Sequence, residues 1–146
     1  MTLLTTIIVA TPSKIRFQQD LNGNGVKDAG EPGLPGWTIT LAGTDSQGQA
    51  VTQTTSTLSD GSYSFTVTPG TYTVYETLKT GWVQTFPKVG TGIVTAPNGT
   101  LGYRVTLTSG QSDTGNDFGN FQRAVKSGVK FNDLDGDGQY EIVLKW

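Results

Sequence analysis

The chain of 146 residues contains neither cysteine nor histidine. Without cysteine it has no disulfide framework and no thiolate nucleophile, and without histidine it has no imidazole base and no His-ligated zinc site. The sequence also offers no isolated pair of carboxylates outside two acidic loops that are described below. These absences exclude the commonest catalytic arrangements, and we expect a protein that is not an enzyme.

Charge is scarce and is not clustered. Charged residues make up 15% of the chain, the net charge is −2, and no group of Lys and Arg marks a nucleic-acid surface. The apolar stretch from Leu3 to Ala10 is too short to span a bilayer and has no basic residue before it. Its β-branched residues favour a strand, with the remnant of a trimmed signal peptide as the alternative. We therefore expect no nucleic-acid partner and no membrane span.

Threonine, valine, aromatic residues and glycine-rich turns dominate the rest of the chain, and no stretch shows a helical period of apolar residues. This pattern predicts an all-β sandwich of short strands. The expected strands are 3–9, 14–18, 37–42, 49–57, 62–68, 71–77, 81–86, 101–108, 116–121, 125–131 and 139–145. In GSYSFTVTPGTYTVYE, apolar and hydroxyl residues alternate on both sides of Pro69–Gly70, which predicts a hairpin of 62–68 with 71–77.

The segment DLNGNGVKDAGEPG, residues 20–33, gathers acidic and amide side chains in a chain that has few charges. It matches the pattern D-x-[DN]-x-[DN]-G-x5-E, in which one short segment supplies several oxygen ligands to a large, hard cation. The expected calcium ligands are the side chains of Asp20, Asn22, Asn24, Asp28 and Glu31 and the backbone carbonyl of Val26. A solvated turn rich in Gly and Asn is the alternative, but it leaves the position of Glu31 unexplained.

The flanks of this loop exclude a true EF-hand. A run of Pro and Gly at 32–36 follows Glu31, where an EF-hand continues as a helix, and the preceding KIRFQ alternates like a strand. The sequence therefore predicts an EF-hand-like calcium loop inserted between strands. Because few of its ligands are charged, we expect an affinity on the order of 10⁻⁴–10⁻³ M or somewhat tighter, which suits calcium outside cells.

The C-terminal segment SGVKFNDLDGDGQYEIVLKW repeats this alternation of ligands. Its expected calcium ligands are the side chains of Asp133, Asp135, Asp137 and Glu141 and the backbone carbonyl of Gln139. Leu144 stands where the first loop has its closing glutamate, so the pattern is incomplete. We nevertheless predict a second calcium site here.

Three blocks in order resemble the B-type repeats of serine-aspartate-repeat surface proteins, relatives of the Cna B-type, prealbumin-like modules of adhesins and pili. The blocks are DLNGNGVKDAGEPGLPGWTITL, TLSDGSYSFTVTPGTYTVYETLKTGWVQTFP and YRVTLTSGQSDTGNDFGNF. The resemblance covers residues 14–121 and implies an Ig-like or prealbumin-like β-sandwich. It also implies a stalk or spacer module, usually in tandem and rigidified by calcium, with further calcium ligands at Asp60, Asn116 and Asp117.

Some relatives lock themselves with an isopeptide bond between a lysine and an asparagine or aspartate, assisted by a buried glutamate. By this resemblance, Glu76 stands where that glutamate would lie, and Asn120 is the candidate partner. Arg16 takes the lysine position, and its guanidinium is no nucleophile, so Lys14 is the candidate substitute. The favoured alternative is a Glu76 that joins a hydrogen-bond network or is simply exposed.

The last residues, DGDGQYEIVLKW, also resemble calcium loops of β-propellers, including those of secreted polysaccharide lyases. This short resemblance implies an alternative function, a carbohydrate-associated accessory module of a secreted polysaccharide-degrading enzyme. Trp37, Trp82 and Phe86 would then form a sugar-stacking surface, although aromatic residues usually serve the core of small β-proteins.

The sequence thus divides into an N-terminal strand or extension (1–13), a calcium-binding β-sandwich (14–121) and a C-terminal strand segment with a second acidic loop (122–146). The last segment buries too little apolar surface to fold alone. The first-choice partner of its apolar residues is a sheet edge of this same chain. Alternatively, either terminal strand could add to a sheet edge of a neighbouring copy, and head-to-tail addition propagates as a filament. We expect an extracellular, calcium-stiffened structural module of a cell-surface adhesin, pilus or filament. Its expected partners are neighbouring copies, tandem domains, or a host or carbohydrate ligand.

Overall fold

The computed structural model describes residues 17–133 and 136–139. Its strands are β1 (Phe17–Gln19), β2 (Thr38–Asp45), β3 (Ala50–Ser56), β4 (Gly70–Glu76), β5 (Trp82–Phe86), β6 (Ile93–Thr95), β7 (Leu101–Leu107) and β8 (Phe118–Gln122). Within the described residues there is no helix, and so none long and apolar enough to cross a membrane. The prediction of an all-β fold is confirmed.

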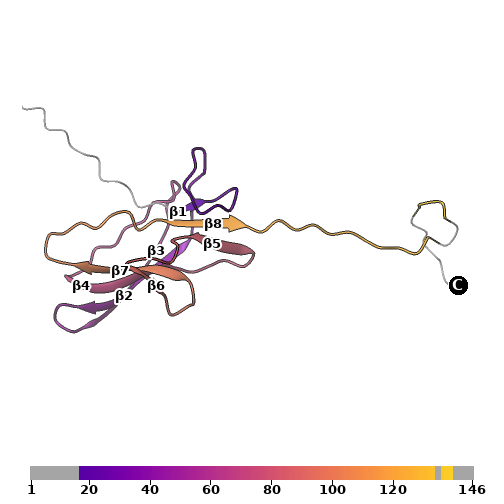
Figure 1. Cartoon of the computed structure of the whole chain (residues 1–146). Helices are drawn as coiled ribbons and strands as arrows, with labels where there is room; N and C mark the ends of the chain where they lie inside the picture. Colours follow the sequence, from indigo (N-terminus) through magenta and orange to yellow (C-terminus); the bar gives the residue numbers. More distant parts are fainter. Residues whose placement is uncertain (1–16, 134–135, 140–146) are drawn as a thin grey trace, which may run out of the picture.

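The strands form two sheets that lie one over the other (Figure 1). One sheet has the order β1-β8-β5, and the other has the order β3-β2-β4-β7-β6. All pairs are antiparallel except β1 with β8, which run parallel with Phe17 beside Phe118. This is the sandwich that the alternating sequence predicts.

The core between the sheets is built from aromatic and β-branched side chains that face inward. Phe17 is 0% exposed, and its ring centroid lies 4.6 Å from that of Trp37 and 5.9 Å from that of Phe118. Tyr103 meets Phe118 edge to face at 5.4 Å. Such pairs add about 0.5–1.5 kcal/mol each beyond the apolar area they bury. The short strand β1 is therefore anchored by Phe17 more than by its few ladder bonds.

The hairpin predicted across Pro69–Gly70 is wrong. Strand β4 forms as expected, but β2 and β7 occupy both of its edges. Residues 63–68 belong to no strand ladder, although Tyr63, Phe65 and Val67 still pack on the core. Alternation reports which side chains are buried, and it carries no information about which strand is the neighbour.

Other strand predictions differ from the structure or lie beyond it. Residues 123–133 form no strand and run away from the sandwich after β8 (Figure 1), so the strand predicted at 125–131 is wrong. The sequence does not predict the short strand β6, because three residues are too few to show a pattern. The strands predicted at 3–9 and 139–145 lie outside the described residues, apart from Gln139, which is in no strand.

The backbone of Gly61 packs directly against the backbone of Phe17 in β1. Its φ is +76°, and its carbonyl accepts a 2.7 Å hydrogen bond from the backbone N–H of Phe17. A Cβ at Gly61 would lie 2.0 Å from the carbonyl oxygen of Phe17. The position therefore tolerates no side chain, both because of its conformation and because of the contact.

We predict that Gly61→Ala lowers the free energy of unfolding by about 3 kcal/mol or more, because left-handed strain and the clash with Phe17 add. Gly110→Ala is the matched control, since Gly110 has φ +74° and a Cβ added there would meet no atom within 4 Å. The control should lose only about 1–2 kcal/mol. Denaturant unfolding of both variants measures the difference, and equal losses would contradict the contact with β1.

Candidate functional site

The first acidic loop begins at Asp20, directly after β1, and the Asp20 carboxylate accepts hydrogen bonds from the backbone of the loop. Asp20 is 1% exposed, and its backbone N–H donates to the carbonyl of Asn120 in β8 at 2.8 Å. Its Oδ1 accepts from the backbone N–H groups of Gly23 (2.6 Å) and Asn24 (3.2 Å), and its Oδ2 accepts from that of Gly25 (2.7 Å). One carboxylate thus folds the glycine-rich half of the loop around itself.

This environment keeps Asp20 ionised. Burial by itself raises the pKa of the carboxyl, but the nearby Thr85 hydroxyl and the three loop amides outweigh it, and the pKa lies below its ordinary value. The Thr85 Oγ1 makes no hydrogen bond of ordinary geometry, so the amides are the bonds that fix the carboxylate. A buried, ionised oxygen donor is what a calcium ligand at the first loop position requires.

Glu31 lies at the end of the loop, and its side chain reaches back to the beginning of the loop. Its Oε1 accepts from the backbone N–H of Leu21 at 3.0 Å, and its Oε2 accepts from the backbone N–H of Asp28 at 3.1 Å. The side-chain amide of Gln18 in β1 also donates to Oε2 at 3.1 Å. The spacing in the sequence predicts this closure, and the structure places both carboxylates of the pattern on the same loop.

The middle of the loop converges on Asp28. The side-chain Nδ2 atoms of Asn22 and Asn24 donate to Asp28 Oδ2 at 2.8 Å and 2.9 Å. Within the described residues no three acidic side chains gather into a metal-binding group, because these amides and the backbone N–H groups take the carboxylate oxygens. The Oδ1 atoms of Asn22 and Asn24 accept from the backbone N–H groups of Asn24 at 3.0 Å and Val26 at 2.7 Å. Turning these oxygens toward a cation would exchange those bonds for metal ligation, and an all-oxygen donor set of this kind fits a hard cation.

Lys88 and Thr85, which the sequence analysis did not single out, lie against the first loop. Lys88, after β5, donates its Nζ to the carbonyl of Asn24 at 3.0 Å. A Cβ at Gly25 would lie 2.6 Å from Lys88 Cε and 2.7 Å from the carbonyl of Thr85. Because Lys88 is so distant from the loop in sequence, no local pattern identifies it, and only the glycine at position 25 hints at a close neighbour.

The second acidic loop repeats the first, bond for bond, with Asp133 in the place of Asp20. Its carboxylate accepts from the backbone N–H groups of Gly136 (2.7 Å), Asp137 (3.1 Å) and Gly138 (2.8 Å). The Gln139 N–H donates to Asp137 Oδ1 at 2.8 Å, as the Val26 N–H does to Asn24 Oδ1 at 2.7 Å. The predicted ligands Asp135 and Glu141 lie outside the described residues.

The three additional ligands implied by the resemblance lie in different places. Asp60 accepts from the backbone N–H and hydroxyl of Ser62 within its own turn, at 3.0 Å and 2.5 Å. Asn116 donates its side-chain amide to Asp113 at 2.5 Å. Asp117 lines a cavity of about 290 Å³ behind the first loop together with Asp20. Asp117 is therefore brought near the first loop, and the backbone of Asp60 lies against Gly33, two residues after Glu31.

Glu76 and Asn120 meet in the core and join the two sheets. Glu76 belongs to β4 and Asn120 to β8, both are 0% exposed, and the Nδ2 of Asn120 donates to Glu76 Oε2 at 2.9 Å. Burial raises the pKa of Glu76 to about 8, against the opposing effect of the Asn120 and Gln84 amides. The candidate isopeptide lysine, Lys14, lies outside the described residues.

The aromatic residues considered for sugar stacking do not form one exposed surface. Trp37 is 2% exposed and packs edge to face on Trp82 with 5.3 Å between ring centroids. The ammonium of Lys79 lies 4.9 Å from the centroid of the Trp37 ring. Phe86 is 37% exposed at the end of β5. Trp37 therefore serves the core, and it offers no face to a sugar.

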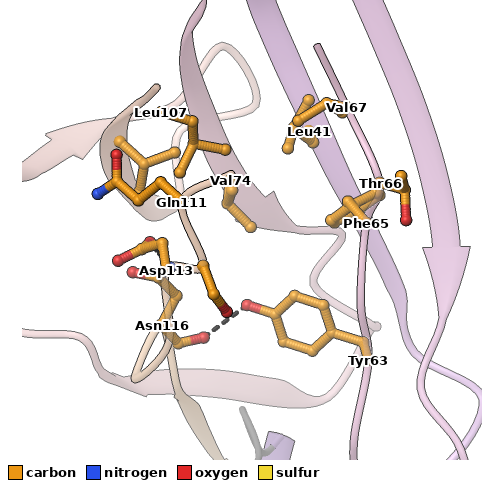
Figure 2. Close-up of a pocket in the computed structure, with 12 residues that line it drawn as sticks. Leu41, Tyr63, Phe65, Thr66, Val67, Val74, Leu107, Gln111, Asp113 and Asn116 are labelled. Atoms are coloured by element: carbon orange, nitrogen blue, oxygen red, sulfur yellow. Dashed lines mark hydrogen bonds between the residues drawn. The ribbon is translucent and has the colours of Figure 1, made fainter. Parts of the chain in front are cut away.

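An open groove lies between residues 63–67 and residues 111–116 (Figure 2). Its volume is about 280 Å³, and its apolar lining comes from Leu41, Phe65, Val67, Val74, Val105 and Leu107. At one end the Tyr63 hydroxyl donates to the carbonyl of Asn116 at 2.5 Å. Sequence reasoning missed this groove, because it exists only where the expected hairpin does not form.

A family model, the SdrD B-like domain, matches residues 16–120. The chain belongs to the SdrD B-like domain family. No curated protein sequence matches the chain. The match begins just before β1 and ends within β8, so it spans every strand of the sandwich. The SdrD B-like domain is a structural module of surface adhesins and belongs to a non-enzymatic family.

We predict that Asp20→Ala destabilises this SdrD B-like domain even without calcium. It leaves three loop N–H groups without their acceptor, which costs about 1–3 kcal/mol. Asp28→Ala is the control, since it removes only the two more exposed bonds from Asn amides and should cost less than about 1 kcal/mol. Urea unfolding in chelator measures both, and an Asp20→Ala loss no larger than the control would contradict the capping role.

Proposed function

We propose that this SdrD B-like domain is a calcium-stiffened structural unit of an extracellular adhesin, pilus or filament. The observation that supports the proposal is the closure of two acidic loops by the same set of hydrogen bonds around Asp20 and Asp133. The two loops share the run D-L-[ND]-G-[ND]-G at 20–25 and 133–138, and the recurrence of this run with the same geometry supports a common ligand. The ligand class is a hard divalent cation, because all donors are oxygens.

In the first loop, calcium would be held by the side chains of Asp20, Asn22, Asn24, Asp28 and Glu31 and by the carbonyl of Val26. The ion would supply positive charge at the centre of the three carboxylates, and it would replace their internal hydrogen bonds. The loop joins β1 to the segment after Glu31, where Gln19 N–H donates to the Pro32 carbonyl at 2.9 Å. Calcium would therefore brace the entry to the sandwich, which is how a stalk module gains stiffness.

Millimolar calcium is expected to raise the unfolding temperature relative to EDTA. Linkage gives about 1.4 kcal/mol of stabilisation when free calcium is about tenfold above Kd, as it is at millimolar calcium and a Kd on the order of 10⁻⁴ M. Glu31→Gln should lose most of this gain, while Asp45→Asn, which changes a carboxylate in the β2–β3 turn, should keep it. Calorimetric melts of the three proteins decide the matter, and identical melts with and without calcium would refute the metal.

We further propose that copies assemble head to tail by strand addition. The donor is residues 125–131, in which Val125, Val129 and Phe131 alternate with Lys126 and Lys130. Val125 is 90% exposed and Val129 is 79% exposed on a segment that leaves the sandwich. These residues form no strand within one copy, but an extended segment with one apolar face can become a strand on a second copy that covers that face.

The acceptor is the apolar groove beside residues 63–68 of a second copy. These residues face the core with alternate side chains but form no ladder, so an incoming strand can bond to their backbone and place its valines in the groove. Asp113 at the groove suits the lysines of the donor. Because the donor segment and the acceptor groove lie at different places on each copy, the same contact can repeat from one copy to the next and build a filament.

Electron microscopy in calcium should show filaments of the unaltered chain, and Val129→Asp should abolish them. Val89→Asp is the matched control, because Val89 is an equally exposed valine (86%) that lies in neither the donor nor the groove. Filaments that survive Val129→Asp, or a chain that stays monomeric at high concentration, would contradict strand addition. Chelator should weaken the filaments only if the calcium loops brace the assembled units.

A further inference from the structure

Two buried oxygens in the core have no hydrogen-bond partner. They are Glu76 Oε1 and Asn120 Oδ1, and they belong to the two side chains already joined by the bond from Asn120 Nδ2 to Glu76 Oε2. Both residues are 0% exposed. Leaving two acceptors unpaired in a dry core is costly. The remaining oxygens of this pair therefore require a donor.

Within the described residues, the elements around Glu76 supply no cation. Strand β2 places Ile39 beside it. The Gln84 amide of β5 lies near the carboxyl and lowers its pKa, but its hydrogen bonds go to both backbone groups of Leu101 and leave Glu76 Oε1 without a partner. Asn98 and Thr100 donate to the backbone carbonyl of Glu76 and leave its carboxyl alone. Within the described residues, no positively charged side chain is among the groups that act on the Glu76 carboxyl.

Tyr63 is a titratable group whose pKa is affected by the charge of Glu76. This effect on the Tyr63 pKa is smaller than those of Tyr103, Asp117 and Asp113. Burial raises the pKa of Tyr63 far above its ordinary value, and its hydroxyl donates to the carbonyl of Asn116. Tyr63 therefore stays neutral and does not compensate a negative Glu76. Strand β8 contributes only the neutral side chain of Asn120 at this point.

We propose that Glu76 is a neutral carboxylic acid in the folded protein, with its proton on Oε1 donated to Asn120 Oδ1. Together with the bond from Asn120 Nδ2 to Glu76 Oε2, this makes a paired acid–amide ring that ties β4 of one sheet to β8 of the other. One proton satisfies both unpaired oxygens at once. One proton thus holds β4 and β8 together at this junction, and its loss breaks the hydrogen bond from Glu76 Oε1 to Asn120 Oδ1.

The sign of the pH dependence follows from the raised pKa. Glu76 titrates near pH 8 when folded and near its ordinary 4.5 when unfolded, so its stabilisation is complete below about 4.5. Between 4.5 and 8 the unfolded chain releases a proton that the folded protein keeps, and the unfolding constant rises up to tenfold per pH unit. Above 8 the contribution is lost. Asp20, with a lowered pKa, acts only at acid pH and does not overlap this window.

Glu76→Gln is the decisive variant, because an amide can donate to Asn120 Oδ1 and accept from Asn120 Nδ2 without any titrating proton. In calcium-free buffer, the unfolding constant of the unaltered chain should rise by a large factor between pH 5 and 8, whereas that of Glu76→Gln should stay nearly constant. The variant should also be the more stable protein above pH 8. Asp45→Asn, which changes a carboxylate in the β2–β3 turn, is the control and should keep the slope of the unaltered chain.

A second measurement does not depend on the variant folding. The carboxyl ¹³C resonance of Glu76 in the intact protein should titrate near pH 8. A titration below 4.5 would show that a cation, such as the ammonium of Lys14, occupies the site, and would overturn the proposal. So would an intact mass lower by one ammonia, which marks an isopeptide bond. None of these readouts uses calcium or assembly, so the proton lock and the proposed function can fail separately.

Discussion

Asn120 is the residue through which the parts of this module are connected. Its backbone carbonyl accepts the N–H of Asp20, where β1 ends and the first acidic loop begins. Its side chain donates to Glu76 across the core. The acidic loop, the three-stranded sheet and the five-stranded sheet therefore meet within one residue, and a displacement of β8 would be felt at all three.

This arrangement explains how a chain with 34% hydrophobic residues makes a rigid unit. The apolar core is small and aromatic, and it is supplemented by two polar contacts that meet at Asn120. One is the set of loop amides gathered on Asp20, and the other is the buried pair of Glu76 and Asn120. Both place a carboxyl group out of water and hold at least one of its oxygens with a fixed donor, which specifies geometry more than it adds stability.

The sequence predicted the features that depend on local spacing. The closure of the loop between Asp20 and Glu31 follows from the spacing of its polar residues, and the buried faces of β2 and β4 follow from alternation. Features that depend on distant pairing were not accessible in this way. Nothing local marks Lys88 as the neighbour of Asn24 or directs residues 63–68 away from β4. The meeting of Glu76 with Asn120, 44 residues apart, was suggested only by family resemblance.

The failed hairpin has a consequence for assembly. Because β2 and β7 occupy both edges of β4, residues 63–68 cover the core with their side chains while their backbone stays outside any ladder. The segment after β8 has the opposite character, with an alternating apolar face and no core beneath it. In the proposed assembly, the unladdered backbone beside the apolar groove is complementary to the uncovered apolar segment after β8, and a single copy shows both. On this proposal, rigidity within the module would come from carboxyl groups held by fixed donors, and attachment between modules would come from exposed valines.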